Sequence, residues 1–443
     1  MVPVDISFGS ASGDVNQLAT HGRAAVTEQH ESPSRLLTAF SDDELRAIAA
    51  DIPAQSAVFL AVKLDGSDRI AAAFGRAIAM EVRRAALVAV AELLGTRARV
   101  FIGGAANGGV IFDIRQRDAS ELIRDTAARL SSTVTVSGVG YFIQNNIGVA
   151  FPEDSPSSDP ADLLQAAIGA IHASVTTGVH IAYAADVSIA DLRAEVALAA
   201  ELASSDDEAF TLHYQPIVKL DTFEVVGYES LLRWTVDGRL RLPGEFLEAA
   251  EETSLIVPIG RWGVTQAIRQ LGAWRESLSD TDSFFISVNF SSQQLYDRDL
   301  TTLVRECLIA EGVPAGALWV EVTERDLISA DSPAAQTIRE LHDLGCVICV
   351  DDLGTGYAAL RYMMDQPITV AKIDRSLVDG MEREGVKRRI VEAVCHLSAT
   401  LDISTVAEGV EHDDQVDLLR EIGFTHGQGF LFGKPAPASE ITR

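Results

Sequence analysis

Basic residues are scarce in this chain of 443 residues. Its 36 lysines and arginines face 64 aspartates and glutamates, which gives a formal net charge of −28 at pH 7. Proteins that follow a nucleic-acid strand neutralise its phosphates with lysine and arginine. The charge balance therefore argues against DNA or RNA polymers as partners. A small phosphate ester remains compatible with the chain if bound cations reverse the local field.

Long apolar runs are also missing. No run approaches the ~18–20 residues that a membrane helix needs. The opening residues, MVPVDISFGSASGDV, lack the basic and apolar regions of a secretion signal. We therefore expect no membrane span and a cytoplasmic protein. Aromatic residues make up only 6%, but hydrophobic residues together reach 47%, so the chain can form globular cores. Its length favours two domains.

Cysteine is limited to four residues, and two of them, Cys346 and Cys349, form a CxxC pair. Such a pair can bind zinc or carry out redox chemistry. The surrounding sequence CVICV predicts a strand, in which side chains three residues apart point to opposite faces. We therefore favour separate packing of the two thiols as small hydrophobic groups.

Composition and periodicity divide the chain into four parts. Residues 1–35 are polar and aperiodic, and we expect a mobile tail there. Residues 36–185 alternate strand-like runs with alanine-rich helical stretches, which indicates one α/β domain. Residues 186–209 have helical spacing and predict a linker helix before a second domain at 210–443.

The second domain contains about eight strand candidates separated by amphipathic helices. This alternation predicts a β/α barrel, although an open doubly wound sheet has the same pattern. The strand candidates are FTLHYQPIV, VVGYESLLRW, FFISVNFS, LWVEVTE, CVICVDD, TVAKID, ISTVAEGV and THGQGFLF.

Polar residues fall at or near the ends of separate strand candidates. In a barrel these ends meet on the face where active sites lie. The residues are Glu229, Asn289, Glu321, Asp351, Asp352, Lys372, Glu408 and Gln428.

Five of these side chains are hard oxygen donors, namely Glu229, Asn289, Glu321, Asp351 and Asp352. Such donors suit Mg²⁺ or Mn²⁺. Adjacent aspartates, one of them bridging, can hold two ions ~3.5–4 Å apart, which is the arrangement of two-metal phosphoryl transfer. The pattern therefore predicts a site for two divalent cations.

Three further residues have both a catalytic and a structural interpretation. Lys372 can neutralise charge on a phosphoryl group or orient the attacking water, and Glu408 can complete the second metal site or accept the proton of that water. Alternatively, Lys372 and Glu408 form only a salt bridge across the barrel mouth. Arg233 can hold a phosphate or form a surface ion pair.

The segment from about 210 to 443 closely resembles the EAL domain, the bacterial cyclic di-GMP phosphodiesterase. Its motifs occur in family order: YQPIV, GYESLLRW with the triplet Glu229-Ser230-Leu231, SVNFS, EVTE, DDLGTGY, KID, AEGVE and QGFLFGKP. A series of this length is far more specific than one triplet.

The resemblance implies a modified (β/α)8 barrel that opens cyclic di-GMP (c-di-GMP) to linear pGpG with two Mg²⁺ or Mn²⁺ ions, and a homodimer. It places Glu408 at the second metal or as general base and Lys372 near the hydrolytic water. Metal roles fall on Glu229, Asn289, Glu321, Asp351 and Asp352. Substrate or active-site contacts fall on Gln215, Arg233, Glu411 and Gln428, and Glu324 anchors the DDLGTGY loop.

The chain departs from the family pattern at four positions of these motifs. Ser230 replaces an alanine, Leu353 a phenylalanine, and Ala358 and Ala359 a serine pair. None of these changes removes a metal ligand. They alter the loop that links dimerisation to metal binding in the family, so they bear on turnover and regulation.

Residues of roughly 50 to 185 resemble a degenerate GGDEF domain, the cyclase partner of EAL domains. Lys63 stands at the first metal aspartate of that family, and Ala71 and Met80 stand at two guanine contacts. A lysine cannot ligate magnesium as a carboxylate does. We therefore expect a regulatory or dimerising domain without cyclase activity. Its loop GGAANGG is either a tight turn or a phosphate cradle.

Two other functions compete with an active phosphodiesterase. The chain could be a non-catalytic c-di-GMP receptor that signals through a protein partner, or a scaffold that binds no ligand. Retention of the whole ligand set favours catalysis over the receptor. The sequence identifies no regulatory partner.

Overall fold

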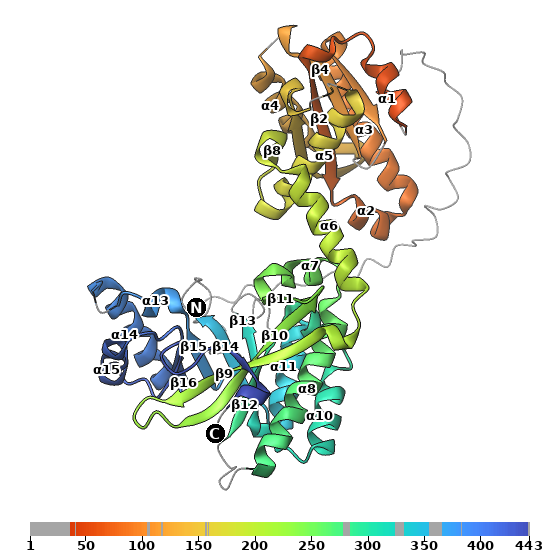
Figure 1. Cartoon of the computed structure of the whole chain (residues 1–443). Helices are drawn as coiled ribbons and strands as arrows, with labels where there is room; N and C mark the ends of the chain where they lie inside the picture. Colours follow the sequence, from red (N-terminus) through yellow and green to blue (C-terminus); the bar gives the residue numbers. More distant parts are fainter. Residues whose placement is uncertain are drawn as a thin grey trace, which may run out of the picture. The chain divides into compact units, whose positions relative to one another are not determined.

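The computed structural model describes residues 36–39, 41–103, 107–116, 118–155, 157, 159–277, 284–323, 332–353, 366–381 and 383–441. The predicted tail, residues 1–35, lies outside these ranges. The chain divides into two compact units, Met1–Leu192 and Arg193–Arg443 (Figure 1). In the described residues, no helix combines the length and the apolar character needed to cross a membrane.

The first unit is a six-stranded sheet with helices on both faces. The strand order is β1 (Leu36–Thr38), β3 (Ala98–Ile102), β4 (Gly108–Asp113), β2 (Ala57–Asp65), β7 (Gln144–Ala150) and β8 (Ile181–Tyr183). Helices α1 (Asp42–Ala49) and α5 (Pro160–Thr177) contribute to one core, and α3 (Arg76–Leu94) and α4 (Ala119–Leu130) to the other. Helix α2 (Ser67–Phe74) precedes α3, and β5 (Thr133–Val136) and β6 (Val139–Phe142) form a separate hairpin.

The central strand β2 is apolar at almost every position because both of its faces are covered. Val58 and Leu60 pack in the core that contains α3, whereas Phe59 and Ala61 pack in the core that contains α5. A strand buried on both sides loses the polar alternation of a half-exposed strand. This explains the run AVFLAV and confirms an α/β architecture for the first unit.

The second unit contains a closed eight-stranded barrel. The strands are β9 (Phe210–Lys219), β10 (Val225–Val236), β12 (Phe285–Phe290), β13 (Leu318–Thr323), β14 (Val347–Leu353), β15 (Val370–Ile373), β16 (Ser404–Ala407) and β17 (His426–Gln428). They follow this order around the barrel, and β9 pairs with both β10 and β17. Strand β9 is antiparallel to both neighbours, while the other pairs are parallel. Two short strands, β11 (Arg239–Arg241) and β18 (Ala436–Pro437), extend the sheet.

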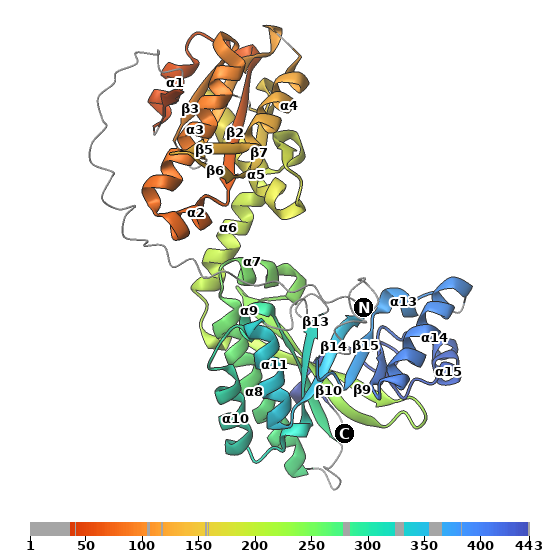
Figure 2. The ribbon, with the colours of Figure 1, turned by 180° about the vertical axis from the view of Figure 1, so that it is seen from behind.

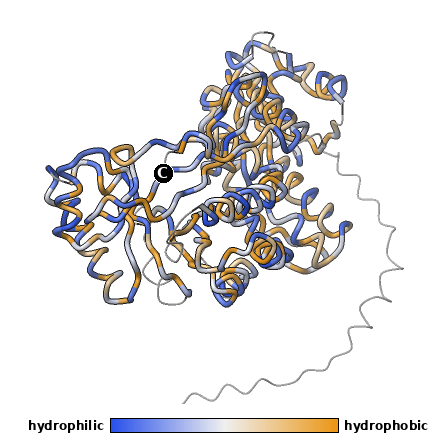
Figure 3. The backbone as a smooth tube through the Cα atoms, turned by 60° about the horizontal axis from the view of Figure 1, so that its bottom comes forward, coloured by the Kyte–Doolittle hydropathy of each residue, from blue (hydrophilic) through white to orange (hydrophobic). Residues whose placement is uncertain are grey.

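Amphipathic helices cover the outside of the barrel. Helices α8 (Ile256–Ser277), α10 (Leu300–Ala310) and α11 (Pro333–Leu344) lie on one side of it, and α14 (Gly385–Thr400) and α15 (Asp413–Ile422) on the other (Figure 2). Figure 3 shows apolar and polar residues alternating along the helical turns of the chain, as expected for helices with one buried face. The shorter helices are α7 (Leu247–Glu252), α9 (Ser292–Leu295) and α13 (Arg375–Val378). Helix α6 (Ile189–Ala203) falls within the predicted linker.

The barrel has an outer core beneath the helices and an inner core between the strands. Cys346 packs in the outer core, while Cys349 packs in the inner core with residues such as Ile217 and Val406. All four cysteines are free. The expected separation of Cys346 and Cys349 by strand alternation is therefore confirmed.

Candidate active site in the barrel

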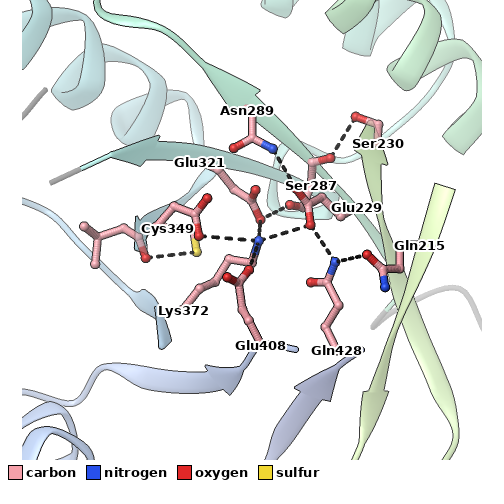
Figure 4. A network of polar contacts seen from close by, with 12 residues as sticks. Gln215, Glu229, Ser230, Ser287, Asn289, Glu321, Cys349, Lys372, Glu408 and Gln428 are labelled. Carbon is pink, nitrogen blue, oxygen red and sulfur yellow. Dashed lines mark hydrogen bonds and ion pairs between the residues drawn. The ribbon is translucent and has the colours of Figure 1, made fainter. Parts of the chain in front are cut away.

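Strand alternation brings the predicted polar residues into the barrel. In β12, Ile286 and Val288 face the outer core, whereas Phe285 packs in the inner core. Ser287 and Asn289 continue the inward series at spacing two and contact side chains of neighbouring strands. The same alternation in the other strands brings polar side chains together in one cluster (Figure 4).

Lys372 lies at the centre of this cluster. It lies in β15 with only 1% of its side chain exposed, and its Nζ atom contacts carboxylates from four other parts of the barrel. The distances are 2.5 Å to Glu408 Oε1, 3.0 Å to Glu321 Oε1, 3.2 Å to Glu229 Oε2 and 3.6 Å to Asp351 Oδ1. The predicted Lys372–Glu408 pair therefore exists, but it is one of four pairs that share a single ammonium group.

Glu229 is held by donors from three strands. Asn289 Nδ2 donates to its Oε1 at 2.7 Å, and Gln428 Nε2 donates to its Oε2 at 2.6 Å, in addition to Lys372. Gln428 Nε2 also lies 3.1 Å from Gln215 Oε1, which links β17 to β9. Of the four predicted substrate or active-site contacts, Gln428 thus bonds to Glu229 directly, and Gln215 is linked to it through Gln428.

Glu321 has two unlike oxygens. Its Oε1 accepts the hydroxyl proton of Ser287 and pairs with Lys372. Its Oε2 is buried and has no hydrogen-bond partner among the residues that the structure describes. Ser287 was not among the predicted site residues, although it occupies an inward position two residues before Asn289.

The cluster contains more negative than positive charge. Burial, together with the charges of Asp351 and Glu229, raises the pKa of Glu408 to about 8 despite its contact with Lys372. Burial likewise raises the pKa of Glu321 well above its usual range. Four carboxylates around one lysine therefore need further positive charge before all of them can ionise.

The donor set fits hard divalent cations. In the described part of the chain, no group of three or more His, Cys, Asp or Glu side chains is spaced to hold a metal ion. The ammonium group of Lys372 lies among the carboxylates instead. The chemistry nevertheless suits Mg²⁺ or Mn²⁺, because the donors are oxygens, the charge is in excess and Glu321 Oε2 is without a partner.

Two predicted residues, Arg233 and Glu411, make hydrogen bonds or ion pairs outside the cluster. Arg233 is buried in β10, and its Nη1 donates to the carbonyl of Leu232 at 2.8 Å. Glu411 pairs with Arg375 at 2.9 Å.

Other predicted residues lie wholly or partly outside the part of the chain that the structure describes. The backbone of Asp352 belongs to β14, but its side chain lies outside the described atoms. Glu324, Ala358 and Ala359 lie outside the described residues.

Glu229 was predicted at or near a strand end, and it lies there only in the part of its strand that pairs with β12. Glu229 is the fifth of twelve residues in β10, because that strand continues beyond the barrel to pair with β11. Within the segment that pairs with β12, residues 227–230, it does lie near the end.

A cavity of about 310 Å³ adjoins the cluster. Asn289, Asp351 and Thr323 line it, and apolar residues that include Leu231 and Ile259 form other parts of its wall. Its position gives a ligand in the cavity direct access to Asn289 and Asp351. Apolar walls with a few converging polar groups are typical of small-molecule sites.

Sequence relatives align with this chain over different lengths. The bifunctional diguanylate cyclase/cyclic di-GMP phosphodiesterase MucR of Pseudomonas aeruginosa is 29% identical over 445 residues, which cover 98% of this chain and 63% of MucR. Cyclic di-GMP phosphodiesterase PdeR of Escherichia coli is 33% identical over 239 residues, covering 54% of this chain and 36% of PdeR. The chain spans only 29–30% of the length of the first curated relatives it matches.

A solved structure of the PaMucR phosphodiesterase in its c-di-GMP complex is also similar. It matches with a TM-score of 0.51 and 34% identity, over 57% of this chain and 100% of that one. The family pattern of the EAL domain matches residues 197–435, which is more than half of the chain. The protein therefore belongs to the EAL domain family.

Proposed function

We propose that the protein hydrolyses c-di-GMP to linear pGpG in the barrel. The observation that carries the proposal is the convergence of Glu229, Glu321, Asp351 and Glu408 on Lys372 beside the 310 Å³ cavity. The activities named for MucR and PdeR and the c-di-GMP complex of PaMucR support the choice of substrate.

Two Mg²⁺ or Mn²⁺ ions complete the proposed site. Glu229, Asn289, Glu321, Asp351 and Asp352 would hold them, with Glu408 at the second. When bound, such ions acidify a water and offset the charge that builds up on a phosphoryl group.

The remaining roles belong to the protein's own side chains. Lys372 orients the attacking water, and Glu408, in its ionised form, accepts the proton of that water. Arg233 contacts a substrate phosphate. Glu411, Gln215 and Gln428 complete the substrate site.

The test is incubation of the purified chain with c-di-GMP and Mg²⁺ or Mn²⁺, followed by chromatographic separation of the products. We expect pGpG only with metal. The near-isosteric variant Glu408→Gln should lose about 100-fold or more in turnover while it keeps the fold, because the amide cannot accept the proton. Unchanged turnover in this variant would refute the assignment of Glu408.

A receptor that binds c-di-GMP without cleavage is the second candidate. It is favoured by the position of Lys372 Nζ, which lies within 2.5–3.6 Å of the proposed metal ligands. If the chain bound c-di-GMP tightly but formed no product at any Mg²⁺ or Mn²⁺ concentration, the phosphodiesterase proposal would be refuted and the receptor would be favoured.

For the first unit we propose a regulatory domain derived from a GGDEF domain. The alignment with the bifunctional MucR covers 98% of this chain, which supports this origin. Lys63 lies in β2, where the family has a metal aspartate, so cyclase activity is not expected.

We also propose a homodimer through the barrel unit. Val386 and Ile390, four residues apart on α14, leave 62% and 43% of their surfaces exposed. Side chains at this spacing share one helix face and suit an apolar contact with a second copy.

A further inference from the structure

The carboxylate of Glu321 is held on one side only. Both of its described contacts, the hydroxyl of Ser287 and the ammonium of Lys372, are made by Oε1. Oε2 is buried in the same cluster without a hydrogen-bond partner among the described residues. A buried carboxylate oxygen left without a donor is costly unless a cation completes its surroundings.

Lys372 cannot fix the rotation of this carboxylate by itself. Its single ammonium group is shared with Glu229 at 3.2 Å and with Glu408 at 2.5 Å, and it acts as a compact charge on a long, flexible stem. It therefore attracts the nearest oxygen of each carboxylate but does not fix the rotation of the carboxylate group.

Ser287 is suited to that task. It lies in β12, which pairs directly with the strand β13 that carries Glu321, and it is completely buried. The side chain is short, and one hydroxyl donor reaches one carboxylate oxygen. The backbone carbonyl of Ser287 in turn accepts a hydrogen bond of 2.9 Å from Ser230 Oγ.

We propose that Ser287 is a positioning residue whose hydroxyl binds Glu321 Oε1 and thereby presents Oε2 to a divalent cation. The proposal rests on the proposed function, because that function supplies the cation. Ser287 acts through Glu321 and touches neither substrate nor metal. In other proteins, residues that hydrogen-bond to a metal ligand without touching the metal fix the orientation of that ligand. Their loss reduces metal affinity by about 10- to 100-fold.

The experiment measures Mn²⁺ binding to the full chain by calorimetry without substrate, together with kcat and KM for c-di-GMP. Ser287→Ala removes the hydroxyl, and Ser287→Thr retains it. Ser398→Ala is the matched control, because Ser398 is equally buried but lies in α14, and its hydroxyl has no hydrogen-bond partner among the described residues.

We expect Ser287→Ala to weaken Mn²⁺ binding by about 10- to 100-fold. The Mn²⁺ concentration for half-maximal turnover should rise in parallel, while KM at saturating Mn²⁺ stays near the wild-type value. Ser287→Thr should recover most of the affinity, and Ser398→Ala should leave it unchanged. Ser287→Cys, with its weaker donor, should fall between, and it replaces the alanine variant if that variant does not fold.

A purely structural role for Ser287 predicts a lower melting temperature with wild-type Mn²⁺ affinity, and that result would overturn the proposal. A wild-type chain that binds no Mn²⁺ would also overturn it. If only the proposed function failed, the wild type would bind Mn²⁺ but cleave no c-di-GMP. The Mn²⁺ affinities of the variants would then still decide the role of Ser287.

Discussion

At the scale of single residues, the stability of the cluster depends on Lys372. Removal of one partner from a buried ion pair leaves uncompensated charge and costs about 3–5 kcal/mol. We expect Lys372→Met to lower the free energy of unfolding by this amount in metal-free buffer, measured by urea denaturation. Turnover should be lost as well. Added Mn²⁺ should restore part of the stability, because it supplies the missing positive charge.

Lys219 provides the comparison for this variant. Its side chain is 40% exposed and pairs with Glu224 at 3.2 Å. Exposed pairs contribute only about 0–1 kcal/mol, so Lys219→Met should change stability little. If both lysine variants had the same stability, the ion pairs of Lys372 would not be important for the fold.

Except for Ser287, the members of the cluster were predictable from the sequence, but their contacts were not. Glu321 and Lys372 stand out because a charged residue in an apolar strand is rare. The four-way sharing of Lys372 depends on strand register and side-chain rotamers, which no local pattern encodes. Ser287 was missed because serine in a strand carries little signal, and only the inward spacing with Asn289 distinguishes it.

At the scale of secondary structure elements, burial in β14 and at the residue just before it should control thiol reactivity. Burial raises the pKa of Cys346 to about 12 and raises that of Cys349 well above its usual range. The thiolate is the reactive form. We expect a thiol reagent at pH 8 to modify Cys307, which is partly exposed, much faster than the three buried cysteines.

Mass spectrometry of the modified peptides checks this expectation. All four cysteines should react at similar rates in denaturant. Rapid native modification of both Cys346 and Cys349 would instead mean that β14 opens readily, and the barrel would then be less stable than its packing suggests.

The eight barrel strands were predicted correctly as elements, because apolar runs of this length are bounded by polar turns. The direction of β9 was not predicted. Only five residues separate β9 from β10, and a connection this short joins antiparallel strands, since a parallel pair needs a crossover of a dozen or more residues. The run TVTVSGVGYF is the hairpin β5–β6, whose turn contains Ser137 and Gly138 at positive φ.

At the scale of the whole molecule, the start of the second unit can be tested by truncation. The sequence predicted a boundary at residue 210, whereas the compact unit begins at Arg193, within α6. Leu202 packs with Phe210 and Trp234, and Trp234 Nε1 donates to Ser205 Oγ at 3.0 Å. These contacts belong to the barrel although they precede its first strand.

We expect a chain of residues 193–443 to be more stable than one of residues 210–443. The buried leucine contributes about 1.5–3 kcal/mol and the hydrogen bond about 1 kcal/mol. Urea unfolding of the two chains provides the measurement. Equal free energies of unfolding would favour the boundary at 210.

Closure of the barrel by β9 determines when folding can finish. Lys219, in the first strand, pairs with His426, in the last, so the two ends of the barrel sequence must meet. During synthesis, β9 can form its hairpin with β10 early, but its other edge stays unpaired until β17 has left the ribosome. Pairings this distant in sequence fold slowly, and an open strand edge invites aggregation. Loss of the last strand should therefore leave a chain that aggregates, because β9 would keep an unpaired edge.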